Sequence, residues 1–400
     1  MKQFSILLGS GFSIPAGMKS VKDINDFIID LKEEDFLITS DQSFILLEGE
    51  STKDFRPNII EEKFFVALIK WYCNEVESEF NYERFYDYFI SYDWFKTNEE
   101  ALEQFYEGFK NGIGIPVHSI DTLATQILRF RDYFSQLISN LLKYKEFYGD
   151  LTTWDYPDYI AFKDFLIKLI ENDVIVHTHT LNHDLLFEHL AKHVHLAGHF
   201  SDGYSEFGSP YYGQIHNRAG DLKKSYMVRL KRFIDQFDRP LRLYKLHGSI
   251  DTYIANIAHP TDITRVKKDW GIGDICKETV DQDENFSYLP MYQHTYPDIL
   301  SGISSKTAWY KQPHYKELVD HFSSNLNTSD VLLVVGYGFK DEGINHLIES
   351  EFLSQGKRMI IIDTQKLSHR LVNFYKTREF EKSLTQLSKE EWDEILNEMI

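Results

Sequence analysis

Short apolar runs recur along this chain, and each is followed by a small polar or glycine-containing motif. The runs occupy residues 4–8, 174–176, 241–246, 331–335 and 359–362. Short, mostly apolar segments like these are typical of strands buried on both faces of a parallel sheet. In doubly wound folds, ligands bind just beyond the carboxyl ends of such strands, so the motifs are candidates for one shared site. The pattern predicts an α/β fold with a Rossmann-like parallel sheet.

A helical pattern lies between the first two runs. From about residue 60 to 148, apolar residues recur at helical spacing, which predicts a large helical insertion. The same spacing predicts helices at 185–196 and 343–353. Ser20 and Asp23 have the spacing of a capping box, although Asp is shorter than the usual Glu, and they predict a helix after Ser20.

Two segments lack periodicity and are rich in polar residues, glycine and proline. We expect a loop at 200–222 and long active-site or interface loops at 251–310. The expected organisation is a Rossmann core formed by 1–59 and 149–365, a helical insertion at 60–148 and a C-terminal helical tail at 366–400.

Charge and cysteine content narrow the class of protein. The 400 residues include 43 Lys and Arg and 62 Asp and Glu, which gives a net charge of −19. A phosphate backbone is bound by clustered Lys and Arg, so we expect no strong direct nucleic-acid binding from so acidic a chain. A local basic patch is still compatible with this net charge. Two cysteines, Cys73 and Cys276, cannot supply a four-cysteine zinc site or a disulfide framework. We expect a cytoplasmic protein.

Membrane insertion is not expected either. No stretch approaches the roughly 18 uninterrupted apolar residues of a membrane span. The run at 4–8 is too short for the core of a signal peptide.

The first motif is a glycine loop that reads Gly9-Ser10-Gly11-Phe12-Ser13-Ile14-Pro15-Ala16-Gly17. Glycines after a strand let the backbone approach a pyrophosphate, and a helix N-terminus favours negative charge. Ile14 stands where a dinucleotide fingerprint has its third glycine, and no Walker A sequence follows. Phosphate binding and a plain tight turn are therefore both open for this loop.

Two further strand-end motifs carry candidate catalytic groups. Asn182 and Asp184 lie in Thr180-Leu181-Asn182-His183-Asp184, and His247 precedes a glycine. An amide donates and accepts hydrogen bonds at once, which suits holding a ribose hydroxyl or a water. An imidazole acts as a general base near neutral pH. Taken singly, each has a structural explanation as well: a helix cap or turn for Asn182, and a loop residue bonded to backbone for His247.

Taken together, four motifs resemble the NAD-binding fold of sirtuin-like proteins. Gly-Ser-Gly-Phe-Ser-(three residues)-Gly at 9–17, Thr-x-Asn-x-Asp at 180–184, His-Gly-Ser at 247–249 and Gly-Tyr-Gly-Phe-x-Asp at 336–341 occur in the sirtuin order. Each motif is weak alone, and the set is specific. The resemblance is closest to the divergent bacterial branch used in anti-phage defence. It covers the Rossmann core, but neither the insertion nor most of 250–320.

The resemblance implies a role for each matching residue. Gly9, Ser10, Gly11, Phe12 and Ser13 belong to the loop that binds the cofactor phosphates. Asn182 would position the ribose or the attacking water, Asp184 would lie near the nicotinamide amide, and His247 would be the catalytic base. Gly336 and Tyr337 would lie near the adenosine ribose, and Asp363 would accept a hydrogen bond from an adenosine hydroxyl.

Two departures separate this chain from deacylating sirtuins. Met18-Lys19-Ser20 stands where they have Pro-Asp-Phe-Arg, and the four cysteines of their zinc ribbon are missing. The resemblance therefore implies an NAD glycohydrolase (NADase) that depletes its substrate NAD in abortive infection, without zinc. ADP-ribosyl transfer and a non-hydrolytic NAD or ADP-ribose sensor that regulates a partner are the alternatives. Family and size imply a homo-oligomer and pairing with a HerA-family hexameric ATPase.

A group of histidines lies in and after the second motif. Its members are His177, His179, His183, His189, His193, His195 and His199. His189 and His193 are four residues apart, a spacing that zinc ligands use, but no Glu lies between them in the zincin arrangement. The alternative is a polar helix face, and we expect no metal.

Overall fold

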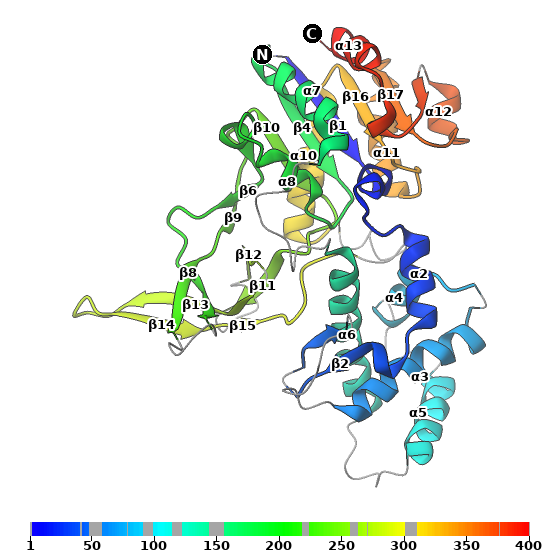
Figure 1. The fold of residues 1–400 in the computed structure, drawn as a ribbon, viewed down its shortest axis with the longest axis vertical. Helices are drawn as coiled ribbons and strands as arrows, with labels where there is room; N and C mark the ends of the chain where they lie inside the picture. The colour runs from blue at the N-terminus through cyan, green and yellow to red at the C-terminus, as the bar shows by residue number, and fades with distance from the viewer. Residues whose placement is uncertain are drawn as a thin grey trace. The chain divides into compact units, whose positions relative to one another are not determined.

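The computed structural model describes residues 2–40, 42–47, 58–77, 79–90, 99–113, 122–143, 156–217, 224–256, 263–269, 271–300, 310–375 and 377–399. The chain divides into two compact units (Figure 1). The sheet unit consists of Met1–Met18, Tyr144–Ile299 and Tyr310–Ile400, and the helical unit consists of Lys19–Lys143 and Leu300–Trp309.

The sheet unit contains a seven-stranded sheet with the order β18-β17-β16-β1-β4-β10-β5. All neighbouring strands are parallel. Counted along the chain, the six longer strands lie in the spatial order 3-2-1-4-5-6, which is the doubly wound Rossmann order. The predicted α/β fold with a parallel sheet is therefore confirmed. The strands are β1 (Gln3–Leu8), β4 (Ile175–Thr180), β5 (Phe200–Ser201), β10 (Leu241–Lys245), β16 (Val331–Val335), β17 (Arg358–Asp363) and β18 (Thr377–Glu381).

Helices cover both faces of this sheet, because alternate residues of each strand point to opposite faces. Phe4, Ile6 and Leu8 of β1 belong to one core with residues of α7 and α13. On the opposite face, Ser5 Oγ lies 2.8 Å from Ser329 Oγ, at the end of α10. The α-helices of this unit are α1 (Ser10–Ser13), a single turn directly after Gly9, and α7 (Ile160–Glu171), α8 (Leu186–Ala191), α10 (Pro313–Thr328), α11 (Glu342–Glu351), α12 (Arg370–Phe374) and α13 (Lys389–Asn397).

The prediction of loops at 200–222 and 251–310 is wrong, because strands occupy much of both segments. A five-stranded sheet has the order β15-β11-β12-β9-β6, and a four-stranded sheet has the order β14-β13-β7-β8. Most residues of these strands are half-buried or exposed, so they lack the apolar runs that marked the central strands. The strands are β6 (Gly203–Ser205), β7 (Tyr211–Asn217), β8 (Lys224–Arg229), β9 (Arg232–Gln236), β11 (Thr252–Asn256), β12 (Thr264–Lys267), β13 (Ile272–Val280), β14 (Phe286–Pro290) and β15 (Tyr292–Gln293).

Three further boundaries differ from the expectation. Strand β4 runs on through His177 to Thr180, because these polar residues are buried by neighbours on both faces. The helix expected at 185–196 ends as α8 at Ala191. The tail expected to be helical includes β18, which extends the central sheet beyond β17.

The helical unit holds the helices expected between residues 60 and 148, together with α2 and a short hairpin. Ser20 and Asp23 form the predicted capping box at the start of α2. Aromatic side chains dominate its interior, where Phe65 and Phe85 are both fully buried. Its elements are α2 (Val21–Asp30), β2 (Phe36–Ile38), β3 (Phe44–Leu46), α3 (Ile59–Glu75), α4 (Tyr82–Ile90), α5 (Glu99–Ile113) and α6 (Leu123–Leu142).

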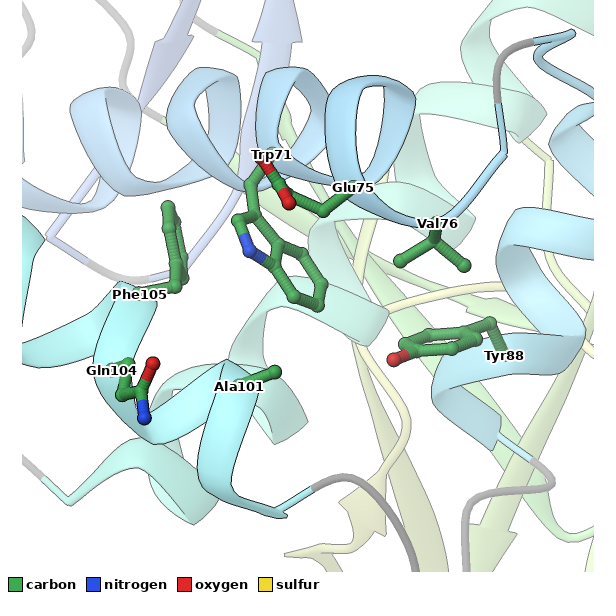
Figure 2. Close-up of a pocket in the computed structure, with 7 residues that line it drawn as sticks. All are labelled: Trp71, Glu75, Val76, Tyr88, Ala101, Gln104 and Phe105. Atoms are coloured by element: carbon green, nitrogen blue, oxygen red, sulfur yellow. The ribbon is translucent and has the colours of Figure 1, made fainter.

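A pocket of the helical unit lies between α3, α4 and α5 (Figure 2). Figure 2 shows the Trp71 indole at its centre, with the Glu75 carboxylate above it. None of the residues singled out from the sequence lines this pocket. Its lining consists of Trp71, Glu75, Val76, Tyr88, Ala101, Gln104 and Phe105.

Candidate functional site

The strand register brings the four motifs to one edge of the central sheet. Leu8 pairs with both Val335 and Thr180, and Thr180 pairs with Lys245. Gly9 and Gly336, the first residues after β1 and β16, therefore lie side by side. Asn182 and His247 each lie two residues beyond the paired ends of β4 and β10. This edge includes the point between β1 and β16 where the strand order reverses, which is where ligands bind in doubly wound folds.

The glycines of the first and fourth motifs are in direct backbone contact. A Cβ atom on Gly9 would lie 2.5 Å from Gly336 O, and one on Gly336 would lie 2.3 Å from Gly11 Cα. Gly336 also has φ +61°, which favours glycine. The amides of Gly9 and Gly11 donate to Val335 O at 2.9 Å and to Gly336 O at 3.0 Å. These two amides therefore hold the neighbouring loop, while the Ser10 side chain is exposed.

Phe12 anchors the glycine loop in the core. Phe12 is 1% exposed, and the centroid of its ring lies 5.5 Å from those of Tyr159 and Phe162. The Tyr159 hydroxyl donates to Phe12 O. The Phe12 ring thus packs in the hydrophobic core and is not exposed to a group bound at this loop.

Asn182 is tethered to the glycine loop through its amide nitrogen. Nδ2 donates to Gly9 O at 2.8 Å and to Ser13 Oγ at 3.0 Å, and the backbone N–H donates to Thr180 Oγ1 at 3.0 Å. Within the described part of the chain, Oδ1 accepts no hydrogen bond. The tether fixes which amide atom is nitrogen, so the oxygen is the atom presented to a water or hydroxyl.

The Asp184 side chain accepts a hydrogen bond within the turn that precedes α8. Its side chain is buried, and Oδ1 accepts from the backbone N–H of Leu186 at 3.0 Å. Its backbone carbonyl accepts from Lys245 Nζ, which also lies 3.3 Å from Glu188 Oε1. Lys245 therefore ties the loop that carries Asn182 to strand β10, two residues before His247.

His247 is buried and contacts two residues that sequence reasoning gave no role. Its Nε2 atom lies 2.7 Å from Tyr310 Oη and 3.2 Å from Asp341 Oδ2. The Tyr310 hydroxyl donates to the same Asp341 oxygen at 2.7 Å. Tyr310 had no signal in the sequence, whereas Asp341 is the last residue of the Gly-Tyr-Gly-Phe-x-Asp motif.

The protonation of this cluster follows from its surroundings. Burial opposes the charged form of Asp341, but the hydrogen bond and positive charge from His247, together with the Tyr310 hydroxyl, hold the pKa of the Asp341 carboxyl well below its usual range. Burial, and then the charge of Asp341, raise the pKa of Tyr310. At neutral pH the cluster thus pairs an ionised carboxylate with a protonated phenol.

The remaining predicted residues lie at the same edge with partners inside the protein. The Tyr337 hydroxyl donates to Asn345 Oδ1 at 2.9 Å and accepts from the Asp341 N–H at 3.2 Å. Asp363, the last residue of β17, accepts from the Gln365 N–H at 3.0 Å. No hydrogen bond joins Asn182 to His247 among the described residues.

The histidine group contains both buried and exposed rings. His179 is fully buried against the Tyr244 ring, with centroids 4.7 Å apart, and burial lowers the pKa of His177 to about 3. Burial likewise lowers the pKa of His189 to about 4. No group of three or more His, Cys, Asp or Glu side chains among the described residues is arranged to hold a metal ion. Over the same residues, no helix is both long and apolar enough to cross a membrane.

Comparison with known proteins returned sirtuin structures. No family model and no curated protein matches the chain. A sirtuin solved to explain substrate affinity is 11% identical, with a TM-score of 0.36 over 99% of this chain and 93% of that chain. Sir2Tm bound to a propionylated peptide is 10% identical, with a TM-score of 0.36 over 99% of this chain and 92% of that chain. Sir2 with a p53 peptide and NAD+ is 11% identical, with a TM-score of 0.34 over 99% of this chain and 92% of that chain. Identities and TM-scores this low carry no functional argument.

Proposed function

We propose that this chain hydrolyses NAD to nicotinamide and ADP-ribose. The observation that carries the proposal is the Asn182 amide, which is locked to the glycine loop through Nδ2 and presents Oδ1 at the sheet edge where His247 also lies. The motifs that resemble the sirtuin-like NAD-binding fold support NAD as the substrate.

The residues at this edge suit a substrate whose reacting centre becomes positive. Breaking the bond between C1′ of the ribose and the nicotinamide nitrogen leaves an oxocarbenium-like ribosyl group. Such a cation is stabilised by fixed oxygen dipoles and by nearby negative charge. The Asn182 amide oxygen and the ionised Asp341 carboxylate behind His247 supply both.

The chemical step balances with water as the only co-reactant. The electron pair of the broken C1′–N bond leaves with nicotinamide, and the water oxygen forms the new bond to C1′. Asn182 Oδ1 accepts a hydrogen bond from that water and orients it. His247 hydrogen-bonds a ribose hydroxyl and raises its electron density, and the proton lost by the water passes to solvent.

The resemblance to the defence branch extends the proposal to a biological role. We place this chain as an effector that depletes NAD during phage infection. It acts as a homo-oligomer in the cytoplasm and is controlled by a HerA-family hexameric ATPase. Co-purification of the chain with the product of a neighbouring ATPase gene tests the pairing, and a chain that elutes alone from cells expressing both genes contradicts it.

The activity is tested by incubating the purified chain, with and without that partner, with NAD and separating the products. We expect nicotinamide and free ADP-ribose in equal amounts. Asn182→Ala and His247→Ala should each lower the rate by about 10²–10⁴-fold, the range for lost proton-transfer and orienting groups. Asn373→Ala and His346→Ala remove the same groups at exposed positions and serve as matched controls.

Three outcomes contradict hydrolysis. NAD that stays intact in every sample, including those with the partner, indicates a sensor. Nicotinamide release with ADP-ribose bound to protein indicates transfer to an acceptor other than water. Equal rates in the two variants and their controls show that Asn182 and His247 do not carry the reaction.

A further inference from the structure

The contacts of His247 determine which of its nitrogens carries a proton. Nε2, Tyr310 Oη and Asp341 Oδ2 form a closed triangle with sides of 2.7, 2.7 and 3.2 Å. The phenol has a single hydrogen, and it donates this hydrogen to the carboxylate. Nε2 must therefore be the N–H donor toward the phenol oxygen and the carboxylate. In the neutral ring the basic lone pair then belongs to Nδ1.

The carboxylate itself is held in place by the start of α11. Asp341 Oδ1 accepts from the Ile344 N–H at 3.1 Å and caps the helix, while Oδ2 faces His247 and Tyr310. The Asp341 N–H donates to the Tyr337 hydroxyl at 3.2 Å. That hydroxyl is fixed in turn by Asn345, which is fully buried. The two carboxylate oxygens thus have separate tasks, and the helix cap orients the one that meets the imidazole.

We propose that Asp341 is a positioning residue for catalysis: it fixes the imidazole of His247 in the Nε2–H tautomer and stabilises its charged form, with Tyr310 as the third member of the cluster. This proposal rests on the proposed hydrolysis of NAD, because it assumes that His247 acts as the base in that reaction. It extends that function to two residues 31 positions apart in sequence.

The test separates the two tasks of Asp341. Asp341→Asn keeps the side-chain size and an N-cap of equal quality, but removes the charge. We expect this variant to fold and to release nicotinamide about 10²–10³-fold more slowly, since correct orientation and protonation of a base are worth this much. Glu342→Gln removes one carboxylate charge from the next residue, which is exposed, and should leave the rate unchanged.

The pH profile distinguishes positioning from a structural role. Tyr310, Asp341 and, with ring centroids 6.2 Å apart, His183 face the imidazole. Without the carboxylate the imidazolium loses a stabilising partner, so the acid limb of the rate profile should move to lower pH in Asp341→Asn. Tyr310→Phe keeps the ring and the direct contact between Asp341 and Nε2, so we expect a loss of only about five-fold, as for one hydrogen bond.

A readout without substrate keeps this proposal separate from the hydrolysis proposal. Nitrogen NMR of the histidine-labelled chain, assigned with His247→Ala, should show the Nε2–H tautomer at high pH in the wild type and its loss in Asp341→Asn. An Nδ1–H tautomer in the wild type overturns the proposal, whether or not NAD is cleaved. An unchanged rate and acid limb in an Asp341→Asn variant with native circular dichroism overturn it as well. A confirmed tautomer in a chain that releases no nicotinamide contradicts the hydrolysis proposal alone.

Discussion

Replacing Lys267 with methionine tests how the sheet unit holds buried charge. Its Nζ atom lies 2.7 Å from Asp202 Oδ2, 3.4 Å from Asp251 Oδ2 and 3.9 Å from Glu188 Oε1. The Lys267 side chain is only 11% exposed, and the three carboxylates are similarly enclosed. Methionine keeps the alkyl chain and removes the ammonium, so the variant loses the cation shared by all three acids.

The expected cost follows from this burial. Removing one partner of a buried ion pair costs about 3–5 kcal/mol, because the other charge is left uncompensated. An exposed pair contributes about 0–1 kcal/mol. We expect the free energy of unfolding of Lys267→Met to fall by about 3–5 kcal/mol at about pH 8.

The loss of unfolding free energy in Lys267→Met should depend on pH. Burial already raises the pKa of the Glu188 carboxyl, and the charge of Lys267 lowers the pKa of both Glu188 and Asp251, so removing Lys267 raises the folded-state pKa of these two acids. A raised folded-state pKa adds stability that is present at low pH and lost as the pH rises through that pKa. The deficit should therefore be smaller at about pH 5 than at about pH 8.

Urea unfolding, followed by tryptophan fluorescence and circular dichroism at both pH values, measures this effect. Lys316→Met is the matched control, because Lys316 pairs with Asp320 on α10 while their side chains are 60% and 62% exposed. Equal losses in the two variants would refute the reasoning, and so would a loss in Lys267→Met that does not change with pH.

Two further substitutions test how the glycine loop is built. Gly336→Ala should lower the free energy of unfolding by about 2–3 kcal/mol or more, because it adds backbone strain and a Cβ 2.3 Å from Gly11 Cα. Gly356→Ala has a similar φ in open space and should cost only about 1 kcal/mol; equal melting temperatures for the two variants would contradict the close contact. Phe12→Ala should cost about 3–5 kcal/mol in urea unfolding, and a loss below about 1 kcal/mol would show that the ring does not anchor the loop.

The central strands could be predicted because strands buried on both faces consist mostly of apolar residues. Strand β16 is wholly apolar and β1 has only Gln3 and Ser5 as polar residues, and each strand ends just before a glycine of the backbone contact. The end of β4 could not be found in this way, since His177, Thr178, His179 and Thr180 are polar yet buried. Their partners are supplied by other elements, as when Asn325 on α10 contacts His179.

The outer sheets escaped prediction for a different physical reason. A strand such as β14 is exposed along its whole length, so it has no alternation of apolar and polar residues that would distinguish it from a polar loop. Pairing with β13 determines its conformation, and pairing is a property of two segments.

The same limit applies to the site. Asn182 and His247 were recognisable from their motifs, but Tyr310 lies 63 residues beyond His247 with no pattern around it. The sequence likewise does not reveal that the amides of Gly9 and Gly11 already hold the backbone of the neighbouring loop.

The contact between Gly11 and Gly336 has a mechanical consequence. Flexible side chains usually absorb small movements between neighbouring loops, but here backbone meets backbone with no side chain between them. A ligand that displaces the loop after β1 must therefore displace the loop after β16. Asp341 lies five residues further along that second loop, so occupancy at the glycines would be transmitted to the carboxylate that faces His247.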